Sequence, residues 1–192
     1  MLGLHLPTDP RWANLAEKQL ADILSDHAYC EQKAVSTCIS LIQTYPEKEA
    51  LVEVLSPIVA EEWSHFRLVL AELKRRGLAF GRQRKDLYVN ELMKLQRKGN
   101  VRWLLLDRLL TSALIEARSC ERFRLLSEQL EDAGLRAFYR TFMESEAGHY
   151  RTFMDLARMY LPKEEVEQRW QYLLREEKEI MHRMELRGDR MH

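Results

Sequence analysis

The chain has 192 residues, of which 46% are hydrophobic and 31% are charged, and this composition is typical of one globular domain with a sizeable core. It excludes a disordered, collagen-like or disulfide-rich protein. Thirty Lys and Arg residues balance thirty Asp and Glu residues, so overall charge creates no attraction to nucleic acid or membranes. No apolar run reaches about 18 residues, and the amino terminus lacks a basic stretch followed by an apolar one. We therefore expect no membrane span, no signal peptide and a cytoplasmic location.

Apolar residues recur at three- and four-residue intervals through almost the whole chain, which is the period of an α-helix. Gly and Pro are few, so long helices are possible. We expect helices over residues 12–45, 47–76, 86–98, 100–132, 134–160 and 163–187, with a bend at Pro57. The sequence predicts one all-α domain over residues 1–192. Two long hairpins, joined by a basic connection at 78–100, would form a four-helix bundle with an extra carboxyl-terminal helix.

Carboxylates and imidazoles interrupt the apolar faces of the first two long helices. Glu31 lies on the stripe that includes Ile23, Leu24 and Val35, and a buried carboxylate is costly unless it is paired or bound to metal. In the next helix, Glu62 and His65 form a Glu-x-x-His motif, which places both side chains on one inward face. The first half of the chain therefore contributes two carboxylates and one imidazole.

The second half repeats this arrangement with Glu116 and the motif Glu146-x-x-His149. The two glutamates of each half are 31 and 30 residues apart, and the halves are offset by 85 and 84 residues. Equal helix lengths would bring all four carboxylates to one level of an antiparallel bundle. Oxygen and imidazole ligands of this kind suit two iron or manganese ions, as in ferritin-like di-iron carboxylate bundles. Buried ion pairing, or chance, is the alternative interpretation.

Several other residues near these motifs have simpler interpretations. A third Glu-x-x-His, at Glu179 and His182, lies in a highly charged segment and is expected on a solvated face. Glu61 and Glu144 are expected at the surface. His27 is expected to be a hydrogen-bonded core histidine; the alternatives are a neighbour of the metal ligands or an alternative ligand. Aromatic residues at helical spacing are expected in the core, where some could line a substrate pocket: Trp63, Phe66, Phe138, Phe142 and Phe153.

One segment is strongly basic although the whole chain is neutral. Between Lys74 and Arg102 there are ten basic and two acidic residues, a local net charge of +8. Such a segment favours a polyanion such as nucleic acid, although a solvated connection without a partner is the alternative. The basic residues are Lys74, Arg75, Arg76, Arg82, Arg84, Lys85, Lys94, Arg97, Lys98 and Arg102.

Four blocks of the sequence resemble the MiaE family of tRNA hydroxylases, and the similarity spans nearly the full chain. The blocks are LGLHLPTDPRW near the amino terminus, IVAEEWSHF, LLLDRLLTSALIEARSCERF and FMESEAGHYRTF. The resemblance implies a monooxygenase that uses a non-haem di-iron centre and dioxygen. Its substrate would be the isopentenyl side chain of 2-methylthio-isopentenyladenosine, next to the anticodon of tRNA.

The resemblance also implies roles for particular residues. The six family ligands correspond to Glu31, Glu62, His65, Glu116, Glu146 and His149, with one iron bound by the first three and one by the last three. The basic segment would hold tRNA phosphates, with Lys74, Arg75, Arg76, Arg82, Arg84, Lys85, Lys94, Arg97 and Lys98 as candidate contacts. A separate reductase or ferredoxin-like protein would supply electrons.

Two rival functions use part of the same evidence. A ferritin-like or rubrerythrin-like protein that stores iron or reduces peroxide would share the ligands. Storage requires a shell-forming oligomer, however, and rubredoxin-type peroxidases need additional paired cysteines, whereas this chain has only Cys30, Cys38 and Cys120, which we expect to be reduced core residues. A tRNA-binding helical protein without enzymatic activity would need the basic segment but not the carboxylates.

Overall fold

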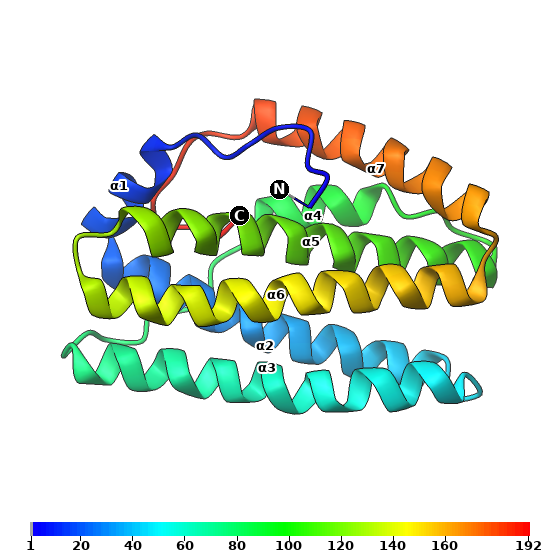
Figure 1. Cartoon of the computed structure of the whole chain (residues 1–192), viewed down its shortest axis with the longest axis horizontal. Helices are drawn as coiled ribbons and strands as arrows, with labels where there is room; N and C mark the ends of the chain where they lie inside the picture. Colours follow the sequence, from blue (N-terminus) through cyan, green and yellow to red (C-terminus); the bar gives the residue numbers. More distant parts are fainter. Residues whose placement is uncertain (1) are drawn as a thin grey trace. The chain divides into compact units, whose positions relative to one another are not determined.

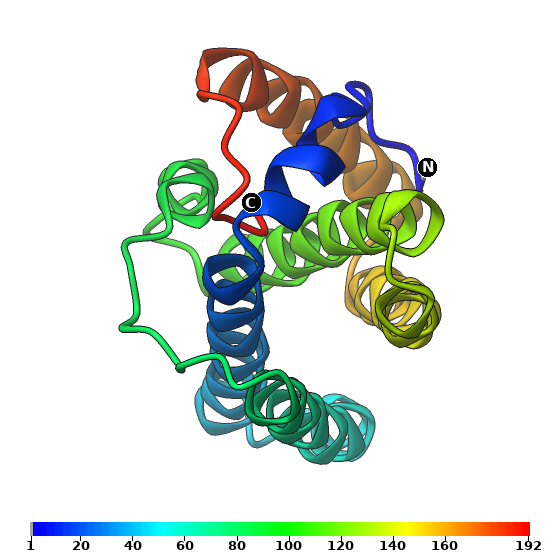
Figure 2. The ribbon, with the colours of Figure 1, turned by 90° about the vertical axis from the view of Figure 1, so that its left-hand side faces the viewer.

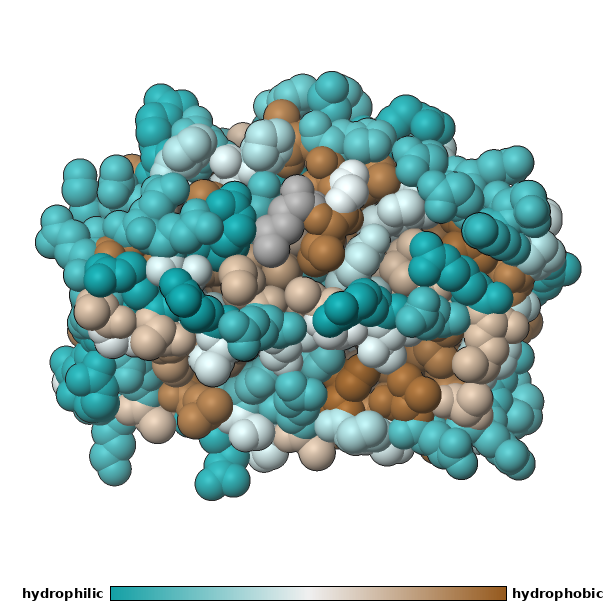
Figure 3. Space-filling model, viewed as in Figure 1, coloured by the Kyte–Doolittle hydropathy of each residue, from teal (hydrophilic) through white to brown (hydrophobic). Residues whose placement is uncertain are grey.

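The computed structural model describes residues 2–192, and this part of the chain contains seven α-helices and no β-strand. The prediction of an all-α protein is therefore confirmed. Within the described residues, no helix combines the length and the apolarity needed to cross a membrane. Figure 3 shows that polar and charged side chains cover most of the face in view, with hydrophobic side chains in scattered patches. The helices are α1 (Arg11–Lys18), α2 (Leu20–Thr44), α3 (Glu49–Arg75), α4 (Leu87–Lys94), α5 (Val101–Gln129), α6 (Ala133–Tyr160) and α7 (Lys163–Arg183).

The chain forms two compact units. The α2–α3 unit comprises Asn14–Lys85 and Arg187–Met191, and the α4–α7 unit comprises the residues up to Ala13, Asp86–Leu186 and His192. Each unit contains one long antiparallel hairpin, drawn in blue and cyan for α2 and α3 and in green and yellow for α5 and α6 (Figure 1). Seen nearly along the helices, the two members of each hairpin lie side by side (Figure 2). The two predicted hairpins are therefore present.

The α2–α3 hairpin follows the predicted pattern closely. Leu24, Leu41, Leu51 and Leu55 are fully buried along the apolar stripes of its two helices. α3 continues without interruption through Pro57, which lies on the exposed side of the helix. The proline supplies no N–H to the carbonyl four residues earlier, and on an exposed face water can satisfy that carbonyl. α3 therefore lacks one hydrogen bond at Pro57 but is not interrupted there, and the bend expected at this position stays a prediction.

The first predicted helix, residues 12–45, is divided in the structure. α1 ends at Lys18 and α2 begins at Leu20, because Gln19 leaves helical geometry with φ −123° and ψ 40°. The apolar spacing continues across Gln19, so periodicity alone could not reveal the break. Trp12 in α1 is fully buried, and the guanidinium of Arg122 lies 4.7 Å from the centre of its ring. This tertiary contact holds α1 and overrides the local preference for one helix.

Close packing of backbone explains a glycine near the carboxyl end of the α2–α3 unit. A Cβ added to Gly188 would lie 2.2 Å from the carbonyl carbon of Leu15 and 2.7 Å from the nitrogen of Ala16. Neither of these backbone atoms can move without displacing α1. Only glycine therefore fits at this position.

We predict that Gly188→Ala lowers the free energy of unfolding by about 2 kcal/mol, because the added methyl group would force the two backbone segments apart. Urea unfolding followed by circular dichroism would measure the change. Gly148→Ala is the control, since a Cβ there meets no atom within 4 Å, and it should leave stability unchanged or raise it slightly. Equal effects of the two substitutions would contradict this explanation.

In the α4–α7 unit, α5 is the central element. α6 and α7 pack on α5, and the helix is buried along most of its length. Side-chain oxygens cap three helices at their amino ends, where Asp86, Asn100 and Asp132 accept hydrogen bonds from backbone N–H groups of the first turns of α4, α5 and α6. These caps place the helix starts close to the predicted positions. α7 ends at Arg183, four residues before the expected boundary.

Asp107 of α5 is a buried anchor for two other segments of this unit. Its carboxylate accepts hydrogen bonds from the backbone N–H and the guanidinium of Arg97 and from the guanidinium of Arg169 in α7. Burial alone would raise the pKa of Asp107, but the hydrogen bonds from these two arginines outweigh burial and lower the pKa below its ordinary value of 3.8. The folded state therefore favours the ionised carboxylate.

A lowered pKa in the folded state contributes stability above the ordinary pKa, and this contribution is lost as pH falls through the lower folded value. We predict that acid titration below about pH 4 lowers the free energy of unfolding and that Asp107→Asn makes this decrease shallower. The same variant should lose about 3 kcal/mol at neutral pH, because two arginines would lack their buried carboxylate. Asp155→Asn, whose side chain is 75% exposed, should change neither quantity. Thermal or urea unfolding across pH would test both expectations.

Candidate metal centre

Glu31, Glu62 and His65 come together inside the α2–α3 unit, as the sequence predicted. One ligand atom of each lies within 4.8 Å of the others. Nδ1 of His65 is 3.4 Å from Oε2 of Glu31 and 3.6 Å from Oε2 of Glu62. The two glutamates are 3% and 1% exposed. Their positions follow from the helix period, since Glu62 and His65 are one turn apart on α3 and face the stripe of α2 that carries Glu31.

His27 orients the first of these carboxylates. It lies one turn before Glu31 on α2, is fully buried, and places Nε2 2.7 Å from Oε1 of Glu31. This hydrogen bond occupies one carboxylate oxygen, while the other oxygen is the one near His65. His27 is therefore a hydrogen-bonded core histidine, as expected, and its partner is a candidate ligand whose orientation it fixes.

Glu116, Glu146 and His149 form the corresponding cluster inside the α4–α7 unit. One ligand atom of each again lies within 4.8 Å of the others, with Glu116 on α5 and the other two on α6. All three are buried, with 6%, 3% and 4% of their surfaces exposed. The two hairpins therefore repeat not only the sequence motif but also the arrangement of the two glutamates and the histidine in space.

The chemistry of both clusters fits a hard divalent cation. Two carboxylates that are buried within 4.8 Å of each other repel unless one is protonated or a cation lies between them. Each cluster offers carboxylate oxygens and imidazole nitrogens. These are the ligands that iron and manganese accept in proteins.

The cysteines take no part in either cluster. All three are free thiols, as predicted, and Cys38 and Cys120 are buried in the core, whereas Cys30 is only partly buried. Burial, with the nearby charge of Glu116, raises the pKa of Cys120 from 9.0 to about 11, so it stays protonated. Its Sγ donates a hydrogen bond to the carbonyl oxygen of Met143. Cys120 is therefore a protonated core residue beside the candidate ligand Glu116.

Burial distinguishes the other residues that the sequence analysis named near these motifs. Glu179 and His182 have side chains that are 60% and 48% exposed, so the third motif is on a solvated face, as expected. Glu61 and Glu144 are also exposed, as expected. Phe142 and Phe153 are buried in the core, and Phe66 and Phe138 are half-buried. The expectation that Trp63 is a core residue is wrong, because 45% of its surface is exposed.

The basic segment is divided between the two units, and many of its charges are already paired. Arg75 and Arg76 bind Glu72, Arg84 binds Asp189, and Arg97 binds the buried Asp107. Lys94 pairs with Glu91 and Arg102 with Glu165. The ion pairs found among residues 2–192 leave four cations of this segment available to a ligand: Lys74, Arg82, Lys85 and Lys98.

A buried charge network in the α4–α7 unit was not anticipated from the sequence. Arg118 is fully buried and donates hydrogen bonds to Glu177 of α7, to the hydroxyl of Thr8 and to the carbonyl oxygen of Leu6. It also pairs with Glu121, whose carboxylate accepts the backbone N–H of Thr8. Burial raises the pKa of Glu177, and Arg118 opposes this effect. The network fastens residues 6–8 and α7 to α5.

A signal for this network was present in the sequence. Glu177 occupies the apolar stripe of α7, between Leu173 and Ile180, and Arg118 interrupts the apolar run of α5 two residues after Glu116. Charges of opposite sign on two buried stripes predict a pair between those stripes. The segment before α1 and the charged last helix thus have a structural role that depends on one arginine.

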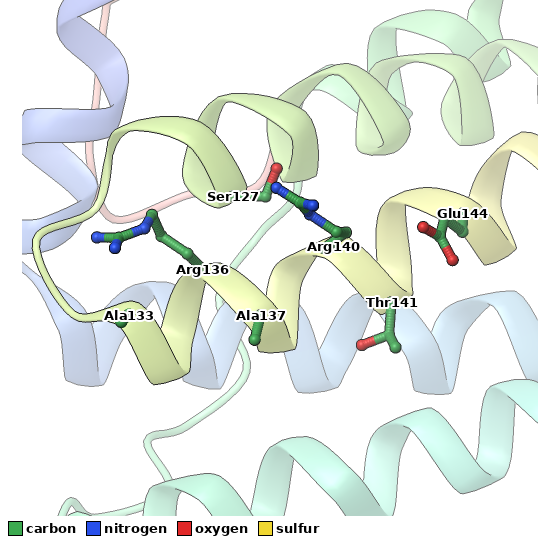
Figure 4. A pocket seen from close by; sticks show the side chains of 7 residues that line it. All are labelled: Ser127, Ala133, Arg136, Ala137, Arg140, Thr141 and Glu144. Atoms are coloured by element: carbon green, nitrogen blue, oxygen red, sulfur yellow. The ribbon is translucent and has the colours of Figure 1, made fainter.

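A pocket of about 380 Å³ lies on the α5–α6 hairpin, and Figure 4 shows Arg136 and Arg140 projecting from α6 along it. Arg136 donates hydrogen bonds to the carbonyl oxygens of Leu130 and Glu131, which lie in the loop between α5 and α6. None of the six candidate ligands lines this pocket. It is lined by Ser127, Ala133, Arg136, Ala137, Arg140, Thr141 and Glu144.

Two helical hairpins, each with a buried Glu, Glu and His cluster, define a protein of the ferritin-like class, and a solved structure supports this fold. "Protein 43 with aldehyde deformylating oxygenase activity from Synechococcus" is 34% identical, with a TM-score of 0.93 over 98% of this chain and 94% of that one. Within this class, residues 2–192 match the family described as tRNA-(MS[2]IO[6]A)-hydroxylase (MiaE). The chain belongs to that family.

Two relatives carry the same name, tRNA 2-(methylsulfanyl)-N(6)-isopentenyladenosine(37) hydroxylase. The protein from Pseudomonas putida is 38% identical over 157 residues, which cover 82% of this chain and 76% of the relative. The protein from Salmonella typhimurium is 28% identical over 218 residues, which cover 88% of this chain and 80% of the relative. The family resemblance stated from the sequence is therefore confirmed.

Proposed function

We propose that this protein is a tRNA-modifying monooxygenase that hydroxylates the isopentenyl side chain of 2-methylthio-isopentenyladenosine next to the anticodon. The observation that carries this proposal is the pair of buried carboxylate–histidine clusters in a chain of the MiaE family. The relatives named above are hydroxylases of that nucleoside. We place the reaction in the cytoplasm, where tRNA is available.

The six clustered residues are the proposed ligands of two iron ions. Glu31, Glu62 and His65 would hold one ion, and Glu116, Glu146 and His149 the other. When bound, the iron pair supplies the activation of dioxygen that hydroxylation of an unactivated C–H bond requires. Each hydroxylation consumes two external electrons, so the proposal includes a separate electron-donor protein.

The surrounding residues orient the proposed ligands and exclude water from them. His27 holds Glu31 through the 2.7 Å hydrogen bond, which leaves one oxygen for the metal. Phe142 lies one turn before Glu146 on α6 and Phe153 one turn after His149, and both are buried. Apolar side chains at these positions exclude water from the second cluster and strengthen the electrostatic interactions inside it.

The basic segment supports the second part of the proposal, binding of tRNA. Lys74, Arg82, Lys85 and Lys98 are exposed and make no ion pair within residues 2–192, so they can neutralise phosphates without breaking an internal contact. The other predicted contacts, such as Arg84 and Arg97, would first have to leave Asp189 and Asp107. We therefore assign phosphate binding mainly to the four free cations.

The central test is the reaction itself. Iron-loaded, reduced protein is incubated with dioxygen and tRNA that carries the methylthio-isopentenyl modification, and the digested nucleosides are analysed by mass spectrometry. We expect a nucleoside heavier by one oxygen, and we expect Glu116→Ala to reduce its formation at least a hundredfold by removing a metal ligand. Glu179→Ala changes the exposed Glu-x-x-His and should have no effect. Bound iron with peroxide consumption but no oxygenated nucleoside would instead support the peroxidase or storage function.

A second test concerns His27. We predict that His27→Ala weakens iron binding by about 10- to 100-fold, because Glu31 loses the partner that fixes its orientation. Titration of the apoprotein with Fe(II) under anaerobic conditions would measure the affinity. His182→Ala is a suitable control, since this histidine is exposed on α7 and should not affect the affinity. An unchanged affinity in His27→Ala would show that the hydrogen bond serves packing only.

A further inference from the structure

Four aromatic side chains form a partly exposed cluster on the α2–α3 unit, which we call the aromatic platform: Tyr29, Trp63, Phe66 and Phe80. The rings of Trp63 and Phe66 stack with centroids 4.9 Å apart, and those of Tyr29 and Phe80 stack at 4.7 Å. Phe66 contacts Phe80 edge to face at 6.2 Å and joins the two stacks. Trp63 and Phe80 are 45% and 41% exposed, although large aromatic side chains are normally mostly buried.

Hydrogen bonds hold this platform in place. Phe80 lies in the segment after α3, which has no regular secondary structure (Figure 2). The neighbouring Gly81 accepts a hydrogen bond from the hydroxyl of Tyr29 and donates one to the hydroxyl of Ser25, each 3.0 Å long. Arg84 binds Asp189 at 2.7 Å a few residues further on. The exposed rings are therefore preorganised for a partner.

The duplicated hairpin shows that the helix packing does not require these aromatics. Trp63 and Phe66 each follow a candidate ligand of α3, and the same positions on α6 are Ala147 and Tyr150. Tyr150 packs against Trp170 of α7, with ring centroids 5.9 Å apart. The second half thus has a small residue and a covered ring where the first half has two exposed, stacked rings. This difference points to a function specific to the first hairpin.

Unpaired positive charges surround the platform in the sequence. Arg67 follows Phe66, and Arg82 and Lys85 follow Phe80; all three are exposed and make no ion pair within the described chain. Lys74, the second-last residue of α3, is also exposed and makes no ion pair within the described chain. Exposed aromatic rings interspersed with free cations are typical of surfaces that bind unpaired nucleotides, with rings stacking on bases and cations on phosphates.

The platform also adjoins the first metal cluster. Glu62 and His65 form one row along α3, and Trp63 and Phe66 form the next row, about 100° further around the helix. His65 is 12% exposed, the most accessible of the three ligands of this unit. A base stacked on Trp63 would lie beside the accessible edge of the cluster.

We propose that the aromatic platform stacks on an unpaired base of the tRNA anticodon loop and so positions the modified adenosine for hydroxylation. This inference rests on the proposed function, because it takes the tRNA loop as the substrate. Arg67, Arg82 and Lys85 bind the phosphates that flank the stacked base. Trp63 is a positioning residue, and the platform distinguishes a single-stranded loop from a duplex of equal charge.

The test compares two RNAs of equal length with the full chain: an anticodon stem-loop and a fully paired duplex. Trp63→Leu should weaken binding of the stem-loop about tenfold and leave duplex binding within about twofold, because only unpaired bases can stack. The slope of log Kd against log salt should be unchanged in this variant, whereas Arg82→Ala should lower it by about one. Trp63→Phe keeps an aromatic ring and should restore most of the affinity.

Trp103→Leu is the matched control, since Trp103 is 44% exposed but lies on α5, with Arg97 over its ring at 5.3 Å. It should not change stem-loop binding. The stem-loop should also quench tryptophan fluorescence in this control but not in Trp63→Leu. The inference would be overturned if Trp63→Leu weakened binding of both RNAs equally, or if it changed the binding of neither. If RNA binding were unchanged but binding of an electron-donor protein were reduced, the platform would be the docking site of that protein.

The outcomes also separate this inference from the proposed function. If the wild-type protein neither binds the stem-loop nor hydroxylates modified tRNA, the proposed function itself fails. If it hydroxylates tRNA and Trp63→Leu has an unchanged KM, only the platform inference fails. A raised KM with little change in kcat would support stacking as the means of positioning.

Discussion

The burial of ionisable groups inside apolar helices is the constraint on which the rest of this structure depends. A carboxylate at 1–6% exposure is costly to keep charged, and the two hairpins bury two each. The cost is acceptable only where a proton, a hydrogen bond or a cation compensates for lost water. Long helices satisfy their own backbone groups, so they can carry such side chains into the core without adding unsatisfied backbone.

The buried carboxylates of this protein lie in two different environments. Around Arg118 and Asp107, each carboxylate faces at least one guanidinium of the same chain. These networks fasten α7, the residues before α1 and the segment before α5. The two Glu, Glu and His clusters instead consist of carboxylates and imidazoles whose ligand atoms lie within 4.8 Å of one another. A cation between these buried carboxylates would relieve their mutual repulsion, which is why we propose them as metal ligands.

Internal duplication supplies a comparison inside the molecule. Both hairpins keep the carboxylates and the histidine at nearly the same spacing, so the candidate metal ligands are the feature that the two halves share. The residues next to those ligands differ, with exposed rings on α3 and a small residue and a covered ring on α6. We therefore expect the substrate to approach the α2–α3 hairpin, whereas the α5–α6 hairpin is covered by α7.

The sequence by itself determined the helices, the hairpins and the three residues in each cluster, because all of these depend on local spacing along a helix. It could not reveal the break at Gln19, since the apolar period continues through it, or the exposure of Trp63, since an amphipathic pattern does not say where a core ends. The sequence also shows ten basic residues in one segment, but it does not distinguish Arg97, which forms an ion pair with Asp107, from Lys85, which forms no ion pair within the described chain. Tertiary structure decided these points because partners distant in sequence fix which charges are paired and which surfaces are covered.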